Sequence, residues 1–130
     1  MKQEDVRILV VDDVNSMRVQ IKDMLRKAGF KNVHSVSTTQ EAKRQLEIEK
    51  FDLVMSDWRI EPTDGLDLLK YIRIHPEQNK LTFIMVTAED AKDLVIQAIK
   101  AGVDDYVVKP VSPVQIQAKV IEVLTKKGLI

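Results

Sequence analysis

The sequence predicts an α/β fold in which a parallel sheet carries helices on both faces. Two observations lead to this class. Short apolar runs alternate five times with longer segments of helical apolar spacing, as in sheets whose parallel strands are joined by crossover helices. The first run, at residues 8–11, is continuously apolar, which is typical of a strand buried on both faces. Residues just after each strand should therefore meet at one edge of the sheet, where such folds bind ligands.

Length and composition narrow the class of protein. A chain of 130 residues is long enough for one domain with a hydrophobic core. Its content of 45% apolar and 31% charged residues is ordinary for a soluble globular protein. Twenty basic and twenty acidic residues give no net charge, which argues against nucleic-acid or membrane partners. The absence of cysteine excludes disulfides and thiolate chemistry, and the two histidines suggest no metal pair. Residues 1–5 do not resemble a signal peptide, and no apolar run could span a membrane, so we expect a cytoplasmic location.

Local signals set the elements in the first half of the chain. Asn15 or Ser16 can cap the first helix, and Gly29 is placed to end it. Thr38 and Glu41 have the spacing of a capping box at the start of the second helix. The expected elements are a strand at 8–11, a helix to about residue 28, a weaker strand at 33–36, a helix to about residue 50 and a strand at 53–55.

The second half continues the alternation. Pro76 ends a helix because the residue before a proline avoids helical geometry, and Gly102 is placed to stop the next one. Ser112 can cap the last helix, with Pro113 in its first turn. The expected elements are a helix near 66–74 with Leu66, Leu69 and Ile72 inward, a strand at 82–87, a helix starting at Glu89 or Asp90, a strand at 104–108 and a helix from 113 to about 127.

Polar residues follow four of the expected strands: Asp12 with Asp13, then Asp57, Thr87 and Lys109. Adjacent acids can simply mark a helix start, a lysine can be a solvated charge, and a threonine can be a plain strand former. Three carboxylates at one edge would repel each other unless a cation intervened, and hard oxygen ligands suit Mg²⁺. We therefore expect a Mg²⁺ site beside a phosphoryl acceptor, with the lysine as a point charge on phosphate.

The combination resembles the receiver domain of two-component response regulators over essentially the whole chain. The resemblance rests on five short motifs, in order: 10–13 (VVDD), 56–57 (SD), 64–65 (DG), 86–89 (VTAE) and 108–110 (VKP). Trp58, Tyr106 and the lack of an output domain look most like single-domain chemotaxis regulators of the CheY-like type. The resemblance implies one receiver domain over 1–130 and a flavodoxin-like, doubly wound fold with strand order 2-1-3-4-5. This strand order is implied by the resemblance alone, since regulators of the CheY-like type are a standard example of it.

The resemblance also implies roles at the site. Asp57 would be the phosphoacceptor that takes a phosphoryl group from a histidine kinase. Asp13 and Asp57 would bind Mg²⁺ directly, Asp12 largely through water, and the backbone carbonyl of Arg59 would complete the protein ligands. Lys109 would pair with Asp57 and then with the phosphoryl group.

Switching would involve two further residues. Thr87 would bond a phosphoryl oxygen and draw its loop inward, and Tyr106 would then move from outside to inside. The bond between Lys109 and Pro110 is expected to be cis, a form that proline makes accessible. The chain would thus act as a switch that phosphorylates itself from a phosphodonor and dephosphorylates itself, without separate enzyme activity.

Two positions depart from the family pattern. Arg59 stands where chemotaxis regulators usually carry Asn, and Glu89 would flank the same mouth of the site. Exposed charges of this kind often barely interact; alternatively, they form a pair that screens the attacking water and slows dephosphorylation. Pro62 stands one position later than the family's usual proline, which puts the path of the loop and the Arg59 carbonyl in question.

The last helix carries two apolar stripes. One fits a core face and consists of Ile116, Val120, Val123 and Leu124. The other, Val114, Ala118 and Ile121, is either covered by neighbouring elements or meets a partner. With Tyr106 it would form the family's usual output surface.

Several functions compete. The favoured one is a chemotaxis regulator whose partners are a histidine kinase, a flagellar motor switch component and an external phosphatase, acting as a monomer or a weak phosphorylation-dependent dimer. A stand-alone receiver in another phosphorelay would share every site residue. A Mg²⁺-dependent aspartate phosphatase would want its first two acids separated by one residue, whereas Asp12 and Asp13 are adjacent. An FMN carrier would not place acids where phosphate binds, and a pseudo-receiver usually lacks one of the acids or the lysine.

Overall fold

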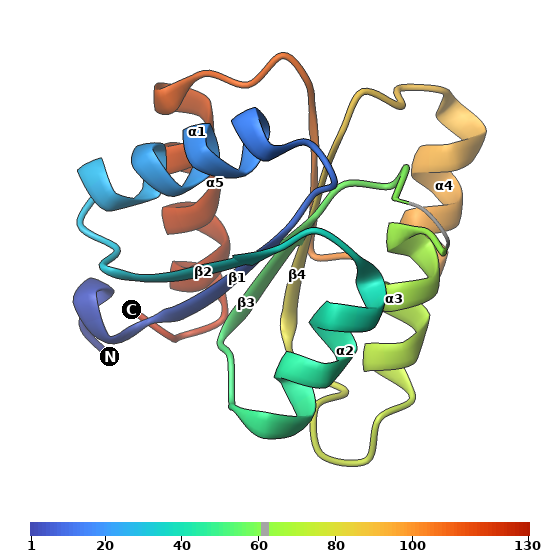
Figure 1. Cartoon of the computed structure of the whole chain (residues 1–130), viewed down its shortest axis with the longest axis horizontal. Coiled ribbons are helices and arrows are strands. Elements are labelled where there is room, and N and C mark those ends of the chain that lie inside the picture. Colours follow the sequence, from blue (N-terminus) through green and yellow to red (C-terminus); the bar gives the residue numbers. More distant parts are fainter. Residues whose placement is uncertain (61–62) are drawn as a thin grey trace.

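The computed structural model describes residues 1–60 and 63–130. A sheet of parallel strands runs through the middle of the molecule, with helices packed on both of its faces (Figure 1). The strand order β2-β1-β3-β4-β5 is the predicted one. The strands are β1 Arg7–Val11, β2 Asn32–Val36, β3 Leu53–Ser56, β4 Thr82–Thr87 and β5 Asp105–Val108.

The helices divide between the two faces. In Figure 1, α1 and α5 lie side by side on one face, and α2, α3 and α4 cover the other. Their bounds are α1 Asn15–Lys27, α2 Thr39–Ile48, α3 Gly65–Arg73, α4 Lys92–Lys100 and α5 Pro113–Lys126, with a short 3₁₀ turn, η1, at Gln3–Asp5. Within the described ranges, no helix is long and apolar enough to cross a membrane.

The two helix layers explain why the strands read as continuous apolar runs. Successive side chains of a strand point to opposite faces. Ile8 and Val10 pack in the layer of α1 and α5, whereas Leu9 and Val11 pack in the layer of α2, α3 and α4. Both faces of β1 are therefore buried, which explains why its run is continuously apolar.

Several end signals are confirmed. The Thr38 hydroxyl accepts a hydrogen bond from the Glu41 amide at 3.1 Å, and Ser112 caps α5 in the same way through Gln115. Gly29 and Gly102 adopt positive φ values of 99° and 95° just after α1 and α4. These left-handed positions favour glycine and end the helices. The second helix ends at Ile48 rather than near residue 50.

Two predicted helix starts are wrong. The N-cap of α1 is Val14 rather than Asn15 or Ser16, and its amide is held by the Asp12 carboxylate at 2.9 Å. The N-cap of α4 is Ala91, so that helix begins at Lys92 rather than at Glu89 or Asp90. The residues before each helix make tertiary contacts: Asp12 pairs with Lys109 before α1, and Glu89 pairs with Arg59 before α4.

The inward face of α3 also differs from its prediction. Leu69 and Ile72 are fully buried as expected, but Leu68 is buried as well, and Leu66 only partly. The helix begins one residue early, at Gly65, because the Asp64 carboxylate accepts a hydrogen bond from the Asp67 amide at 2.8 Å.

Candidate functional site

The carboxyl edge of the sheet brings the predicted residues together. β1 and β3 pair in register, with Val11 opposite Ser56, so Asp12 and Asp57 follow neighbouring strand ends. The Asp57 amide donates to the Val11 carbonyl at 2.9 Å and extends this pairing by one residue. On the other side of β4, the Lys109 amide donates to the Thr87 carbonyl at 2.8 Å. The four strand ends thus place their polar side chains at one edge.

Three carboxylates form a compact cluster at this edge. Asp12, Asp13 and Asp57 each offer an oxygen within 4.8 Å of the others. Asp12 is only 1% exposed and Asp57 9%, whereas Asp13 faces solvent. Removing ionised carboxylates from water is costly unless positive charge compensates them. The burial of two of the three makes a compensating cation a physical requirement of the site.

Lys109 supplies part of that charge. Its ammonium group lies 2.9 Å from Oδ2 of Asp12 and 2.9 Å from Oδ2 of Asp57. Burial by itself would lower the pKa of Lys109, but hydrogen bonds and charges from the two aspartates outweigh it and raise the pKa above its usual value. One ammonium group faces three carboxylates, so the cluster retains an excess of negative charge.

The remaining negative charge and the donor set fit a hard divalent cation. All the side-chain donors are carboxylate oxygens, which suit Mg²⁺ or Ca²⁺ rather than softer metals. Asp12 uses one oxygen for Val14 and the other for Lys109. Within the described ranges, the Asp13 carboxylate accepts no hydrogen bond, and it is therefore the most available direct ligand.

The backbone around Asp57 is tightly packed. The Trp58 amide donates to Oδ1 of Asp57 at 2.7 Å, and the Ser56 hydroxyl donates to the Asp57 carbonyl at 2.9 Å. The Gly65 amide donates to the Trp58 carbonyl at 2.8 Å. A Cβ at Gly65 would lie 2.1 Å from the Asp57 carbonyl oxygen, so only glycine fits here. Gly65 was expected only as part of a motif, because a close backbone approach leaves no local sequence signal.

Thr87 and Tyr106 lie beside the cluster. Thr87 is fully buried, and its hydroxyl accepts a hydrogen bond from the Glu89 amide at 3.3 Å. Tyr106 is half-buried, and its hydroxyl donates to the Glu89 carbonyl at 2.5 Å. Burial raises the pKa of Tyr106, and the charges of Glu89, Asp57 and Asp90 add to that effect.

Of the two alternatives for Arg59 and Glu89, the structure shows the paired one. Nε of Arg59 donates to Oε1 of Glu89 at 2.7 Å, across the mouth of the site. The Arg59 side chain is 70% exposed. The hydrogen bond to Glu89 raises the pKa of Arg59 above its usual value. The placement of the Arg59 carbonyl as a metal ligand stays a prediction, and Pro62 lies outside the described residues.

The bond between Lys109 and Pro110 is cis, as expected. On α5, the predicted core stripe is buried throughout. The second stripe faces solvent: Val114 is 77% and Ile121 37% exposed, and Ala118 is exposed as well. Val114 and Ala118 are therefore left uncovered by neighbouring elements, whereas Ile121 is covered in part.

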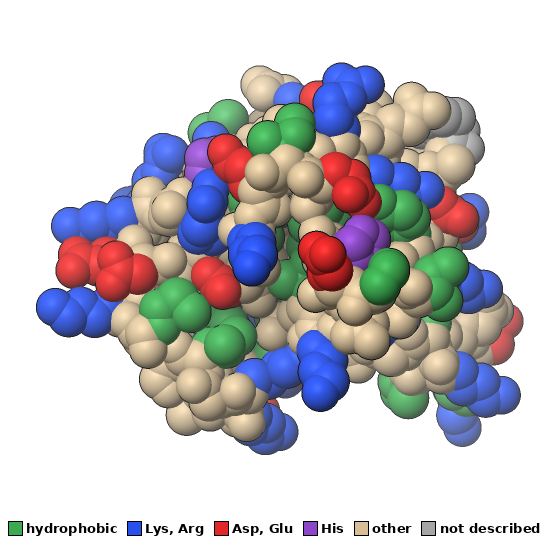
Figure 2. Space-filling model, turned by 90° about the horizontal axis from the view of Figure 1, so that it is seen from below, with side chains coloured by type: hydrophobic (Ala, Val, Ile, Leu, Met, Phe, Trp, Pro, Cys, Tyr) green, Lys and Arg blue, Asp and Glu red, His purple; other side chains and the backbone are tan. Residues whose placement is uncertain are grey.

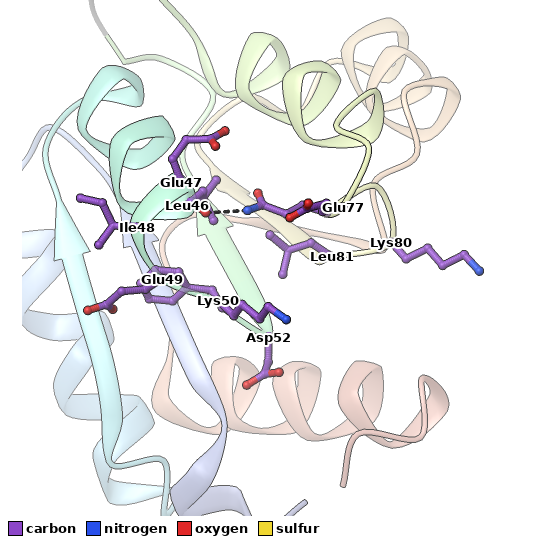
Figure 3. A pocket seen from close by; sticks show the side chains of 11 residues that line it. Leu46, Glu47, Ile48, Glu49, Lys50, Asp52, Glu77, Lys80 and Leu81 are labelled. Carbon is purple, nitrogen blue, oxygen red and sulfur yellow. Dashed lines mark hydrogen bonds between the residues drawn. The ribbon is translucent and has the colours of Figure 1, made fainter.

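A separate groove lies at the opposite, amino edge of the sheet. It has a volume of about 780 Å³ and is lined by the end of α2, the segment between α2 and β3, and the segment before β4 (Figure 3). Among its lining residues, Gln78 donates a hydrogen bond to the Leu46 carbonyl at 2.5 Å. Figure 2, which views the molecule from below, shows side chains of both charges mixed over this side. None of the predicted site residues lines the groove.

A five-stranded parallel sheet in this order, with an acidic cluster and a lysine at its carboxyl edge, is the architecture of phosphorylation-controlled receiver domains. The family model for "Response regulator receiver domain" matches residues 8–121, and the chain belongs to this family. Members of the family act in two-component signalling and bind a divalent metal at an acidic pocket.

The chain is similar in sequence to chemotaxis proteins of two bacteria. The chain is 37% identical over 116 residues to "Chemotaxis protein CheY-3" of Vibrio cholerae serotype O1, covering 89% of each chain. It is also 37% identical over 115 residues to "Chemotaxis protein CheY" of Pseudomonas aeruginosa, covering 88% of this chain and 93% of that one. A CheY-like receiver domain protein from Methanospirillum hungatei has a solved structure that superposes with a TM-score of 0.87, at 28% identity over 95% of this chain and 96% of that chain.

Proposed function

We propose that the protein is a response regulator whose Asp57 accepts a phosphoryl group from a histidine kinase. The observation that carries this proposal is the position of the Asp57 carboxylate, which is bonded to Lys109 and shares its edge with Asp12 and Asp13. Phosphoryl transfer needs charge neutralisation and in-line positioning more than covalent help from the protein. Lys109 supplies part of the neutralisation, and a cation held by the acidic cluster would supply the rest.

The chemistry follows from the same contacts. An oxygen of Asp57 attacks the phosphorus atom while the bond to the donor's imidazole nitrogen breaks, leaving an acyl phosphate on Asp57. Lys109 already bonds Oδ2 of Asp57 and can turn its ammonium group to a phosphoryl oxygen. When bound, Mg²⁺ would supply positive charge to the same oxygens, and Asp12, Asp13 and Asp57 would hold it.

The same site removes the phosphoryl group by admitting water, so the signal has a lifetime. The Arg59–Glu89 pair lies across the mouth of the site and restricts the approach of water to phosphorylated Asp57. It therefore slows dephosphorylation. No separate activity on external substrates is part of the proposal.

The output is a change at the surface that contains Tyr106 and the exposed stripe of α5. Thr87 bonds a phosphoryl oxygen and draws its loop inward, and Tyr106 follows. The names of the relatives support a role in chemotaxis. In that role, the partner of this surface is a flagellar motor switch component, as the family resemblance implies. The exposure of Val114, Ala118 and Ile121 supports binding there, whether to that partner or in a weak dimer.

The experiment is intact-mass measurement after incubation with Mg²⁺ and acetyl phosphate, followed by capture of partners by the phosphorylated form. The mass of one phosphoryl group should appear in the wild type and not in Asp57→Asn. Incorporation that persists in Asp57→Asn would contradict the assignment of the acceptor. Capture of a histidine phosphotransfer protein in place of a motor component would assign the chain to another phosphorelay.

A further inference from the structure

Glu89 makes three contacts that join the mouth of the site to Tyr106. Its carboxylate binds Nε of Arg59 at 2.7 Å, its amide donates to the Thr87 hydroxyl at 3.3 Å, and its carbonyl accepts the Tyr106 hydroxyl at 2.5 Å. Arg59 is two residues from Asp57, and Tyr106 belongs to the proposed partner surface. A single residue therefore lies between the phosphoacceptor loop and that surface.

The position of Glu89 depends on few other contacts. The helix α4 begins only at Lys92. The methyl side chain of its N-cap, Ala91, cannot accept a capping hydrogen bond. The described part of the chain supplies no other hydrogen bond to Glu89. The bond to Thr87 is long for an N–H donor, whereas the bond to Arg59 is short and charge-assisted. Of the contacts on this loop, the Arg59 pair is therefore well placed to fix the carbonyl that Tyr106 uses.

We propose that Arg59 is a positioning residue for Tyr106. Its ion pair with Glu89 holds the Glu89 carbonyl where the Tyr106 hydroxyl binds it. This raises the population of the half-buried, Glu89-bonded position of Tyr106 in the structure, here called the inward position. The two contacts share one residue, so their coupling is reciprocal: a partner that binds inward Tyr106 also strengthens the Arg59–Glu89 pair. The consequence for signalling rests on the proposed function, because there Tyr106 belongs to the switching surface.

The size of the effect is bounded by the exposure of the pair. Exposed ion pairs are weak and are screened by salt. Losing this one should shift the ratio of inward to outward Tyr106 by roughly two- to fivefold rather than abolish the inward position. High ionic strength should produce part of the same shift in the wild type, and it should add little once Arg59 is removed.

The test uses the chain's two tyrosines as separate probes. The protein is labelled with 3-fluorotyrosine, and Tyr71→Phe identifies which ¹⁹F resonance belongs to Tyr106. The solvent exposure of each ring is measured from the ¹⁹F shift between H₂O and D₂O, in metal-free protein so that the Mg²⁺ site does not contribute. In Arg59→Gln, the Tyr106 fluorine should become more exposed, and Arg59→Lys should restore part of the wild-type value.

Further variants separate the ion pair from a general disturbance of the loop. Glu89→Gln should move Tyr106 in the same direction, and combining it with Arg59→Gln should add little. Lys43→Met is a matched control, because it breaks an exposed pair with Asp67 and removes a cation 5.0 Å from the Tyr71 ring. It should move the Tyr71 resonance and leave Tyr106 unchanged.

The outcomes distinguish the inference from the function on which it rests. An unchanged Tyr106 resonance in Arg59→Gln would overturn the positioning role, even if the protein takes up phosphate normally. A shift that Arg59→Lys does not reverse, or that adds fully to that of Glu89→Gln, would overturn it as well. If Tyr106 responds as predicted but Asp57 takes up no phosphoryl group, the coupling stands and the proposed function fails.

Discussion

Lys109 and Asp57 are 52 residues apart in the chain, yet their side chains meet at 2.9 Å. The ends of β3 and β5 bring them to one edge, and Asp12 at the end of β1 shares the same ammonium group. This arrangement leaves one cation among three carboxylates. This excess of negative charge favours the binding of a metal cation beside Asp57.

Replacing Lys109 with Met should destabilise the metal-free protein by about 1–3 kcal/mol. Removing one partner of a buried charge pair leaves the others uncompensated, although partial exposure reduces the cost. The pKa of Lys109 is raised in the folded protein, so its stabilising contribution is complete below the usual value of 10.5 and is lost as pH rises through the raised pKa. Urea unfolding of both proteins at several pH values measures this. A stability difference that is absent at pH 7 would contradict the pairing.

Asp13→Asn should act in the opposite direction on the metal-free protein. Neutralising one of three clustered carboxylates relieves repulsion, so the free energy of unfolding should rise by about 0.5–1.5 kcal/mol without metal. The stabilisation that Mg²⁺ gives the wild type should then largely disappear. Urea unfolding with and without Mg²⁺ tests both effects. Asp23→Asn on α1, an exposed acid that pairs with Lys27, is the control and should keep the full response to Mg²⁺.

Arg59→Asn should shorten the lifetime of the phosphoryl group several-fold. The substitution removes the bond to Glu89 and opens the mouth of the site to water. Phosphorylation of Asp57 should change little, because the Arg59 side chain pairs with Glu89 and not with Asp57. The rate is followed by intact mass after the phosphodonor is removed. An unchanged lifetime would show that the pair does not restrict water.

Ile121→Lys should weaken binding to the output partner about tenfold or more and leave phosphorylation intact. The side chain lies in the exposed stripe of α5, so a lysine there costs little in folding but places a charge in an apolar contact. Ile116→Lys is the contrasting variant, because Ile116 is fully buried and its replacement should unfold the protein. Loss of phosphorylation in Ile121→Lys would mean that this residue also belongs to the core.

Local sequence signals predicted most of the fold. The continuous run 8–11 identified a strand buried on both faces, and Ser112 and Gly102 marked helix ends correctly. Alternation of strands and helices does not by itself determine strand order, which came from the family resemblance. The start of α1 was misplaced because the Asp12 carboxylate, which also pairs with the distant Lys109, binds the Val14 amide. The start of α4 was misplaced because Glu89 pairs with Arg59, 30 residues away, before the helix begins.

The site residues were recognisable for a related reason. Parallel strands end at one edge, so polar residues after each apolar run could be expected to meet. What could not be predicted was which atoms pair: Lys109 bonds Asp12 as well as Asp57, and Tyr106 bonds the Glu89 carbonyl. Such choices depend on side-chain directions and loop paths that only the folded structure fixes.

The most direct test of the phosphoacceptor assignment is the fluorescence of Trp58, the chain's single tryptophan. The indole ring is buried, and the backbone amide of Trp58 donates to Oδ1 of Asp57 at 2.7 Å. Both metal binding and phosphorylation should therefore change the Trp58 emission. We predict one change on adding Mg²⁺ and a second on adding acetyl phosphate, with the second absent in Asp57→Asn. No response to either addition, with the intact mass also unchanged, would mean that the acidic cluster is not a working phosphorylation site.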